Sequence, residues 1–166
     1  MAILNGIEIR GIVSNRGRKS AVVWMEDRHI GNWSQDEWGS PDRFSGELST
    51  IVKTKAETFR EGVSKTSRFY SVADSEEIFM DRLATLVEVE EAAKRTMKRG
   101  CRTVIILPTR EGLIEYSYRG LVSDDLIEKN LGHEEGFRDR MIFRDSVNID
   151  MVVNKDHPAP DWMVRI

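Results

Sequence analysis

Residues 74–100 have the sequence DSEEIFMDRLATLVEVEEAAKRTMKRG, which predicts one long amphipathic helix. At 100° per residue its apolar side chains fall on one stripe that would face a core. The stripe consists of Phe79, Leu83, Leu86, Ala93 and Met97. Asp74 and Glu77 match a capping box at the start, and Gly100 suits the left-handed position after the last turn. We therefore predict a helix over about residues 75–99.

Glu90 lies in the middle of this apolar stripe. A carboxylate directed at a core is either paired or functional, because an unpaired buried charge is costly. Lys94 follows at the favoured ion-pair spacing of four residues, and that pairing would make Glu90 structural. The alternative is that Glu90 faces a cleft and acts with Asp150 or Glu115, from predicted strands, as metal ligands or an acid/base pair. Only this alternative requires a cofactor, a divalent metal such as Mg²⁺ or Mn²⁺.

Short segments that favour strands flank the helix on both sides. Residues 7–25 predict a hairpin with a turn at 14–19, and further strands are predicted at 103–108, 113–118 and 147–153. A short helix fits 124–131 between Ser123 and Gly132, and another helical turn or two fits 137–143. This order predicts an α+β fold, in which an antiparallel or mixed sheet built from hairpins is covered on one face by the long helix plus one or two short helices. A βαβ crossover through the long helix is the alternative.

Two segments lack a clear period. Residues 26–49 are polar and interrupted by three glycines and a proline, so they predict a long loop, a feature that often carries function. Residues 48–70 fit either a helix followed by a strand or two strands, and both alternatives stay open.

Two groups of side chains are candidates for partner contacts. Trp33 and Trp38 lie among polar residues of the predicted loop, where no periodic apolar face would bury them. Tryptophan is a common interface anchor, although one aromatic ring can also pin a loop to the core. Arg16, Arg18 and Lys19 at the hairpin tip could contact phosphates, or they could simply keep an exposed turn soluble. Acidic residues beside the tryptophans favour a protein partner over a nucleic acid.

Composition sets the broad class. The chain has 166 residues, 40% of them apolar and 32% charged, which predicts one globular domain over residues 1–166. The single cysteine excludes an internal disulfide and a multi-cysteine metal site, and it suits a reducing compartment. The longest apolar runs, 21–25 and 104–107, are far shorter than the roughly 20 residues that span a bilayer. No signal peptide is visible, so we expect a cytoplasmic protein without membrane contact.

The common catalytic motifs are missing. No two glycines are separated by one residue, no Gly-Lys-Ser/Thr follows a glycine loop, and no serine occupies a Gly-x-Ser-x-Gly elbow. The sequence therefore favours a small binding module that uses the tryptophan loop and the basic hairpin tip. A protein is the favoured partner, and a nucleic acid is possible. The alternative is a small metal-dependent hydrolase or nuclease that uses Glu90.

Overall fold

The computed structural model describes residues 1–36, 41–61, 76–109, 111–145 and 152–153 of the chain. The chain divides into two compact units, of which the first comprises Met1–Val87 with Met151–Ile166 and the second Glu88–Asp150. The long helix contributes residues to both units. A single domain over 1–166 therefore stays a prediction.

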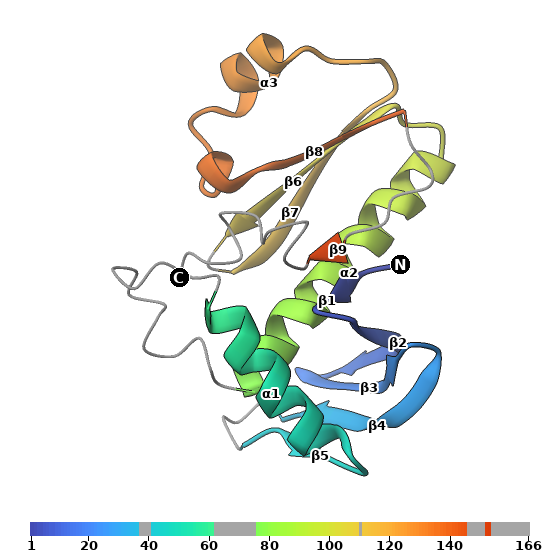
Figure 1. Ribbon diagram of the computed structural model, residues 1–166. Coiled ribbons are helices and arrows are strands. Elements are labelled where there is room, and N and C mark those ends of the chain that lie inside the picture. Colours follow the sequence, from blue (N-terminus) through green and yellow to red (C-terminus); the bar gives the residue numbers. More distant parts are fainter. Residues whose placement is uncertain (37–40, 62–75, 110, 146–151, 154–166) are drawn as a thin grey trace. The chain divides into compact units, whose positions relative to one another are not determined.

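The predicted α+β class is confirmed, because the described residues form antiparallel strands and separate helices, one of them long (Figure 1). The strands belong to two sheets, one in each unit, whereas the sequence predicted one sheet. The alternative of a βαβ crossover was wrong, since the strands before and after the long helix belong to different sheets.

The first unit contains a mixed sheet with the strand order β5-β4-β3-β2-β1-β9, in which only β1 and β9 run parallel. Its elements are β1 (Ile3–Leu4), β2 (Ile7–Asn15), β3 (Arg18–Met25), β4 (Arg28–Gln35), β5 (Arg43–Phe44), α1 (Leu48–Glu61) and β9 (Val152–Val153). The hairpin predicted over 7–25 is confirmed, and its turn is only Arg16-Gly17. Both turn residues have positive φ, which matches the twist of the flanking strands.

The core of the first unit lies on one face of this sheet. The buried residues of that face are Ile7, Ile9, Ala21, Val23 and Trp33. Helix α1 contacts β4 and adds buried Leu48, Val52 and Ala56. This helix confirms the first half of the helix-then-strand alternative for residues 48–70, while 62–75 lie outside the described residues.

The prediction of a long loop over 26–49 was wrong, because most of its described residues belong to β4, β5 and the start of α1. The register between β3 and β4 shifts at Val23 and Trp24. Such a shift breaks the alternation of buried and exposed side chains from which a strand is recognised. Accordingly His29 is exposed, whereas both Ile30 and Gly31 are buried.

Gly31 is required by packing. A Cβ at this position would lie 2.1 Å from the carbonyl oxygen of Ser45 and 2.8 Å from the Cβ of Leu48. The chain entering α1 therefore passes directly over β4. In the sequence Gly31 indicated a loop, but in the structure it is the residue that permits this close approach of two backbone segments.

Helix α2 (Glu76–Lys98) confirms the predicted long helix. Every residue of the predicted apolar stripe is buried. Gly100 has a φ of +91°, and its N–H donates to the Met97 carbonyl at 3.0 Å, so the predicted left-handed end is confirmed. The predicted cap residue Asp74 lies outside the described residues. The Glu77 carboxylate accepts a hydrogen bond from the Asp42 backbone N–H at 3.0 Å.

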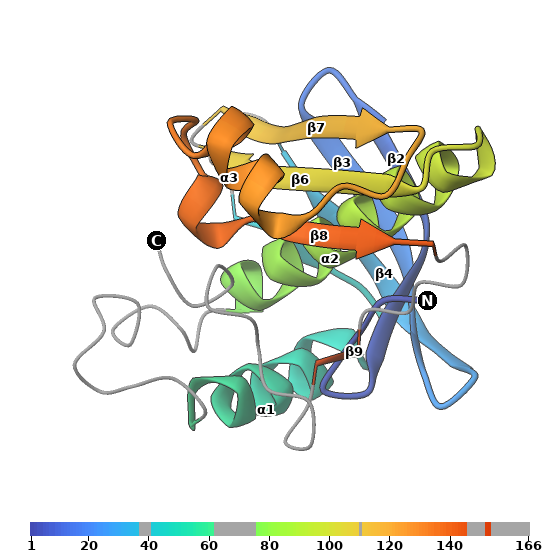
Figure 2. The ribbon, with the colours of Figure 1, turned by 90° about the horizontal axis from the view of Figure 1, so that it is seen from above.

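The second unit contains an antiparallel sheet with the order β7-β6-β8, consisting of β6 (Thr103–Thr109), β7 (Gly112–Tyr118) and β8 (Met141–Arg144). Helix α3 (Asp124–Leu131) lies on one face of this sheet, where Ile127 and Leu131 pack with Ile105 and Leu107 (Figure 2). Its predicted N-cap is confirmed, because Ser123 Oγ accepts from the Leu126 N–H at 3.4 Å. Of residues 137–143, in which a helical turn or two was predicted, Phe137–Asp139 form one 3-10 turn and the residues from Met141 onward belong to β8.

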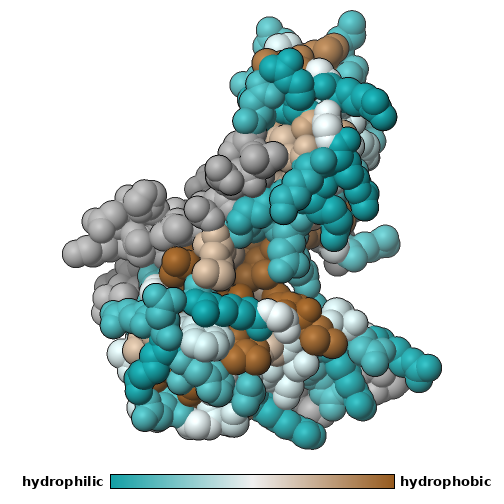
Figure 3. All heavy atoms as spheres, turned by 90° about the vertical axis from the view of Figure 1, so that its right-hand side faces the viewer, coloured by the Kyte–Doolittle hydropathy of each residue, from teal (hydrophilic) through white to brown (hydrophobic). Residues whose placement is uncertain are grey.

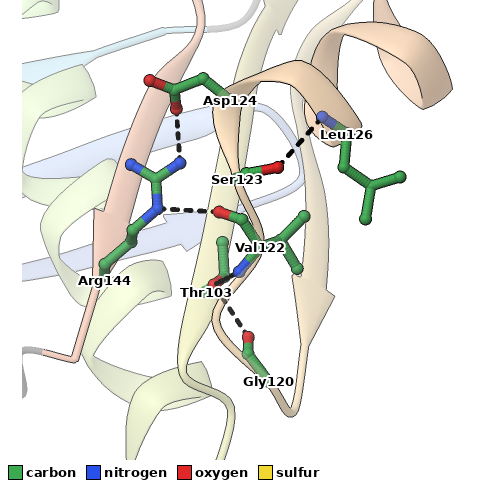
Figure 4. A network of polar contacts seen from close by, with 7 residues as sticks. All are labelled: Thr103, Gly120, Val122, Ser123, Asp124, Leu126 and Arg144. Carbon is green, nitrogen blue, oxygen red and sulfur yellow. Dashed lines mark hydrogen bonds and ion pairs between the residues drawn. The ribbon is translucent and has the colours of Figure 1, made fainter.

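A network of polar contacts fixes the connection from β7 to α3 (Figure 4). Thr103 Oγ1 donates to the Gly120 carbonyl at 2.9 Å and accepts from the Val122 N–H at 3.1 Å. Arg144 Nε donates to the Val122 carbonyl at 3.0 Å, and its Nη2 contacts Asp124 at 2.5 Å. The segment that leads into α3 is thus tied to β6, and both this segment and the first residue of α3 are tied to β8.

Candidate functional site

A groove crosses the sheet of the first unit at the tip of the β2–β3 hairpin. Two hollows of about 430 and 380 Å³ share four lining residues, Val13, Ser20, Ser34 and Arg43. These four are successive cross-strand partners in β2, β3, β4 and β5. Cross-strand partners have side chains on the same face of a sheet. The groove therefore follows one row of side chains across four strands, on the face opposite the core.

Cations concentrate along this row and at the tip beside it. Arg18 and Lys19 line the smaller hollow with Arg43, while Arg16 is exposed in the turn with a φ of 50°. Asp36 forms an ion pair with Arg18 at 2.9 Å. The sequence-predicted basic residues of the hairpin tip therefore lie together, and β5 adds a further cation that was not predicted.

The remaining groove wall combines apolar and hydrogen-bonding groups. An apolar group on this face is Val13, which is 61% exposed. The backbone N–H of Asn32 donates to Ser45 Oγ at 3.0 Å, which fixes the segment after β5 against β4. The side chains of Ser20, Ser34 and Asn32 supply polar contacts to an occupant. The groove can hold an extended chain through apolar, polar and ionic contacts together.

The same face carries a cluster at the opposite end of the strands. The Arg10 guanidinium stacks over the Trp24 ring at 4.3 Å from its centroid, and the Trp24 and His29 rings are 5.7 Å apart. Arg10 also pairs with Glu8 and, at 3.0 Å, with Asp27. Two carboxylates thus engage the end of the Arg10 guanidinium, while its Nε and the Trp24 Nε1 are buried without a hydrogen-bond partner in the described part of the chain. We place the candidate site at the hairpin tip, where the two hollows lie.

Trp33 is 1% exposed and belongs to the core, so the prediction that it contacts a partner from an open loop was wrong. The structure instead matches the alternative, in which the Trp33 ring pins this segment to the core. Its Nε1–H donates to Asp42 Oδ2 at 2.7 Å. Burial raises the pKa of Asp42, and the hydrogen bond from Trp33 opposes that rise. Trp38 lies outside the described residues.

Glu90 forms an ion pair with Lys94 at 2.6 Å, which confirms the structural interpretation of this buried carboxylate. Glu115 accepts a hydrogen bond from the Thr96 hydroxyl at 2.5 Å, and Asp150 lies outside the described residues. Within the described ranges there is no group of three or more His, Cys, Asp or Glu residues that could hold a metal ion. Of the three carboxylates proposed for the alternative metal site, Glu90 and Glu115 are described, and each is bonded to a residue of α2.

Comparison with known protein families, with curated proteins and with solved structures finds no match to this chain. None of the described helices combines the length and the apolar character that a bilayer-spanning segment needs. Function therefore has to be inferred from the groove.

Sequence reasoning found the basic tip but missed the rest of the groove. Ser20, Ser34 and Arg43 are ordinary polar residues that carry no motif. Only the strand register aligns them, and the shift between β3 and β4 conceals that register in the sequence.

Proposed function

We propose that this protein is a binding module that holds an acidic segment of a partner protein in the groove at the hairpin tip. The observation that supports this proposal is the row Val13–Ser20–Ser34–Arg43, flanked by Arg18 and Lys19. An extended segment along such a row would contact Val13 at one end and Arg43 at the other, with Arg18 beside the row. Arginine is well suited to this role, because its planar guanidinium can bind a carboxylate through two parallel hydrogen bonds.

A protein segment fits the groove better than a nucleic acid. Asp36 lines the groove and pairs with Arg18, so it offsets one of the cations that a continuous phosphate backbone would need. A peptide needs fewer cations, because one acidic residue can face Arg43 while a neutral residue faces Asp36. Single-strand binders also stack successive bases on several aromatic rings. Among the residues that the structure describes, the aromatic residues at the two hollows are Trp33 and its cross-strand partner Phe44, which share the core-facing row.

The proposal is tested by binding to defined probes. We would measure fluorescence anisotropy with a labelled peptide of alternating Glu and Val, the same peptide with Gln in place of Glu, and a single-stranded oligothymidylate. The Glu peptide should bind, and Arg43→Glu should weaken its binding at least tenfold, which corresponds to about 1.4 kcal/mol. Affinity should also fall as salt rises from about 50 to about 300 mM, because the contacts are exposed charges.

Arg119→Glu is the matched control, since Arg119 is exposed in the second unit and the substitution changes net charge equally. This control should leave the Kd within about twofold. Equal binding of the Glu and Gln peptides would contradict the proposal, and so would an equal loss in both variants. Tighter binding of the oligothymidylate than of the Glu peptide would instead assign the groove to nucleic acid.

A further inference from the structure

Strand β7 is an edge of the sheet in the second unit. Among the described residues it is hydrogen-bonded only to β6, with which it pairs without interruption from Gly112 to Tyr118. An edge strand directs the N–H and C=O groups of every second residue away from its neighbour, and these groups can bond to another strand.

The sequence and register of β7 itself contain little of the usual protection of an edge. It contains no proline, lysine or arginine and no bulge, and Glu115 is its only charged residue. The opposite edge of the sheet is different, because β8 has four residues and ends at Arg144, which is bonded to Val122 and Asp124. Of these two edges, β7 is the longer template for an added strand.

The two faces of β7 differ in polarity. Tyr116 and Tyr118 are partly buried against the cluster formed by β6 and α3, and Ile114, on the same face, is 42% exposed. Glu115 and Ser117 lie on the other face. A strand that extends this sheet should therefore be apolar on the α3 side and polar on the opposite side, and β7 itself has that pattern.

We propose that β7 pairs with β7 of a second copy of this chain, antiparallel about Tyr116. This register places Ile114 opposite Tyr118, Glu115 opposite Ser117, and Tyr116 opposite Tyr116. The apolar faces of the two strands are then continuous, and aromatic and aliphatic cross-strand pairs of this kind stabilise sheets. The result is one sheet that runs through both copies.

Neighbouring registers are less favourable. A shift of two residues in one direction places Glu115 opposite Glu115, and like charges in that position are destabilising. The same shift in the other direction reduces the overlap to residues 116–118. A shift of one residue sets the polar face of one strand beside the apolar face of the other. The register about Tyr116 keeps residues 114–118 paired without opposing charges.

Cysteine cross-linking tests both the pairing and the register. Glu115→Cys and Ser117→Cys are prepared with Cys101→Ser, since Cys101 is the native thiol; both substituted positions are exposed. A mixture of the two variants should form a disulfide-linked heterodimer at least fivefold faster than either variant alone. Fast cross-linking of Glu115→Cys by itself would contradict this register. Equal rates in all three samples would contradict the β7 pairing.

The mass in solution supplies an independent test. Multi-angle light scattering should show a concentration-dependent rise from 19.1 kDa towards twice that mass. Ile114→Lys places a charge on the edge and should weaken the dimer at least tenfold. Leu126→Lys is the matched control, because Leu126 is also an exposed apolar residue, 45% exposed, but lies on α3 and not on the edge strand. Hydrophobic residues are visible at the top of Figure 3. A monomer at every concentration, or an equal effect of both substitutions, would overturn the inference.

Discussion

Trp33 provides the sharpest test of the fold of the first unit, because the structure assigns it to the core and the sequence had placed it in a contact loop. Trp33→Ala should lower the free energy of unfolding by about 3–5 kcal/mol, the range for removing a large buried aromatic side chain. Trp33→Phe keeps an aromatic ring but removes the 2.7 Å hydrogen bond to Asp42. A hydrogen bond to a charged group contributes about 1.5–3 kcal/mol, so this variant should lose at least that amount.

Urea unfolding followed by far-ultraviolet circular dichroism measures both effects without depending on tryptophan fluorescence. The unfolding midpoint should fall while the slope stays constant, which shows that stability changed and not the surface exposed on unfolding. Val13→Ala is the control, because Val13 is 61% exposed and its truncation should cost less than about 0.5 kcal/mol. A loss below about 1 kcal/mol for Trp33→Ala would refute the buried position of this ring.

The pH dependence of the Trp33→Phe effect follows from Asp42. Burial raises the pKa of Asp42 in the folded protein, and the Trp33 N–H lowers it by stabilising the carboxylate. Removing that donor raises the folded pKa further. A carboxyl group with a raised folded pKa binds more protons in the folded state, so stability falls as pH rises from about 4 through the folded pKa. The difference between wild type and Trp33→Phe should therefore be larger at pH 7 than at pH 3.

Two further predictions concern ion pairs of the second unit. Lys94→Met removes the cation that pairs with the buried Glu90 carboxylate and should lower the free energy of unfolding by about 1–3 kcal/mol. The double variant with Glu90→Leu should recover most of that loss. An unchanged free energy of unfolding for Lys94→Met, measured by urea unfolding, would contradict the pairing. Hydrogen bonds from the Arg102 guanidinium lower the pKa of Asp145, so the pair stabilises the fold above the unfolded pKa of about 3.9 and this contribution is lost as pH falls through the lower folded pKa. Arg102→Gln should raise the pKa of Asp145 in a carboxyl NMR titration, and an unchanged titration would argue against this contact.

The parts of the fold that the sequence predicts are those whose signals are local. Helix α2 is recognisable because its apolar stripe and the Gly100 stop occur within one segment. The β2–β3 hairpin is recognisable for the same reason. Strand β4 is not, because the register shift beside Trp24 buries both Ile30 and Gly31, and the alternation that marks a strand disappears.

The site could be predicted only in part, because a groove across strands depends on register. The hairpin tip is basic in the sequence, so Arg18 and Lys19 are visible as candidates. Arg43 lies more than twenty residues later, beside a tryptophan segment that looks like a loop. It joins the groove through its cross-strand pairing with Ser34, which depends on the tertiary structure and has no local signal in the sequence.

The division of α2 between two units has a consequence for folding cooperativity. The helix has 23 residues, and the boundary after Val87 cuts it near its middle. The two halves, residues 76–87 and 88–98, are at or just below the roughly 12–15 residues at which isolated helices become even marginally stable in water. Each half is therefore helical largely because the other half continues it. Local opening of one unit should fray the helix into the other, so hydrogen exchange along α2 should report the stability of both units at once.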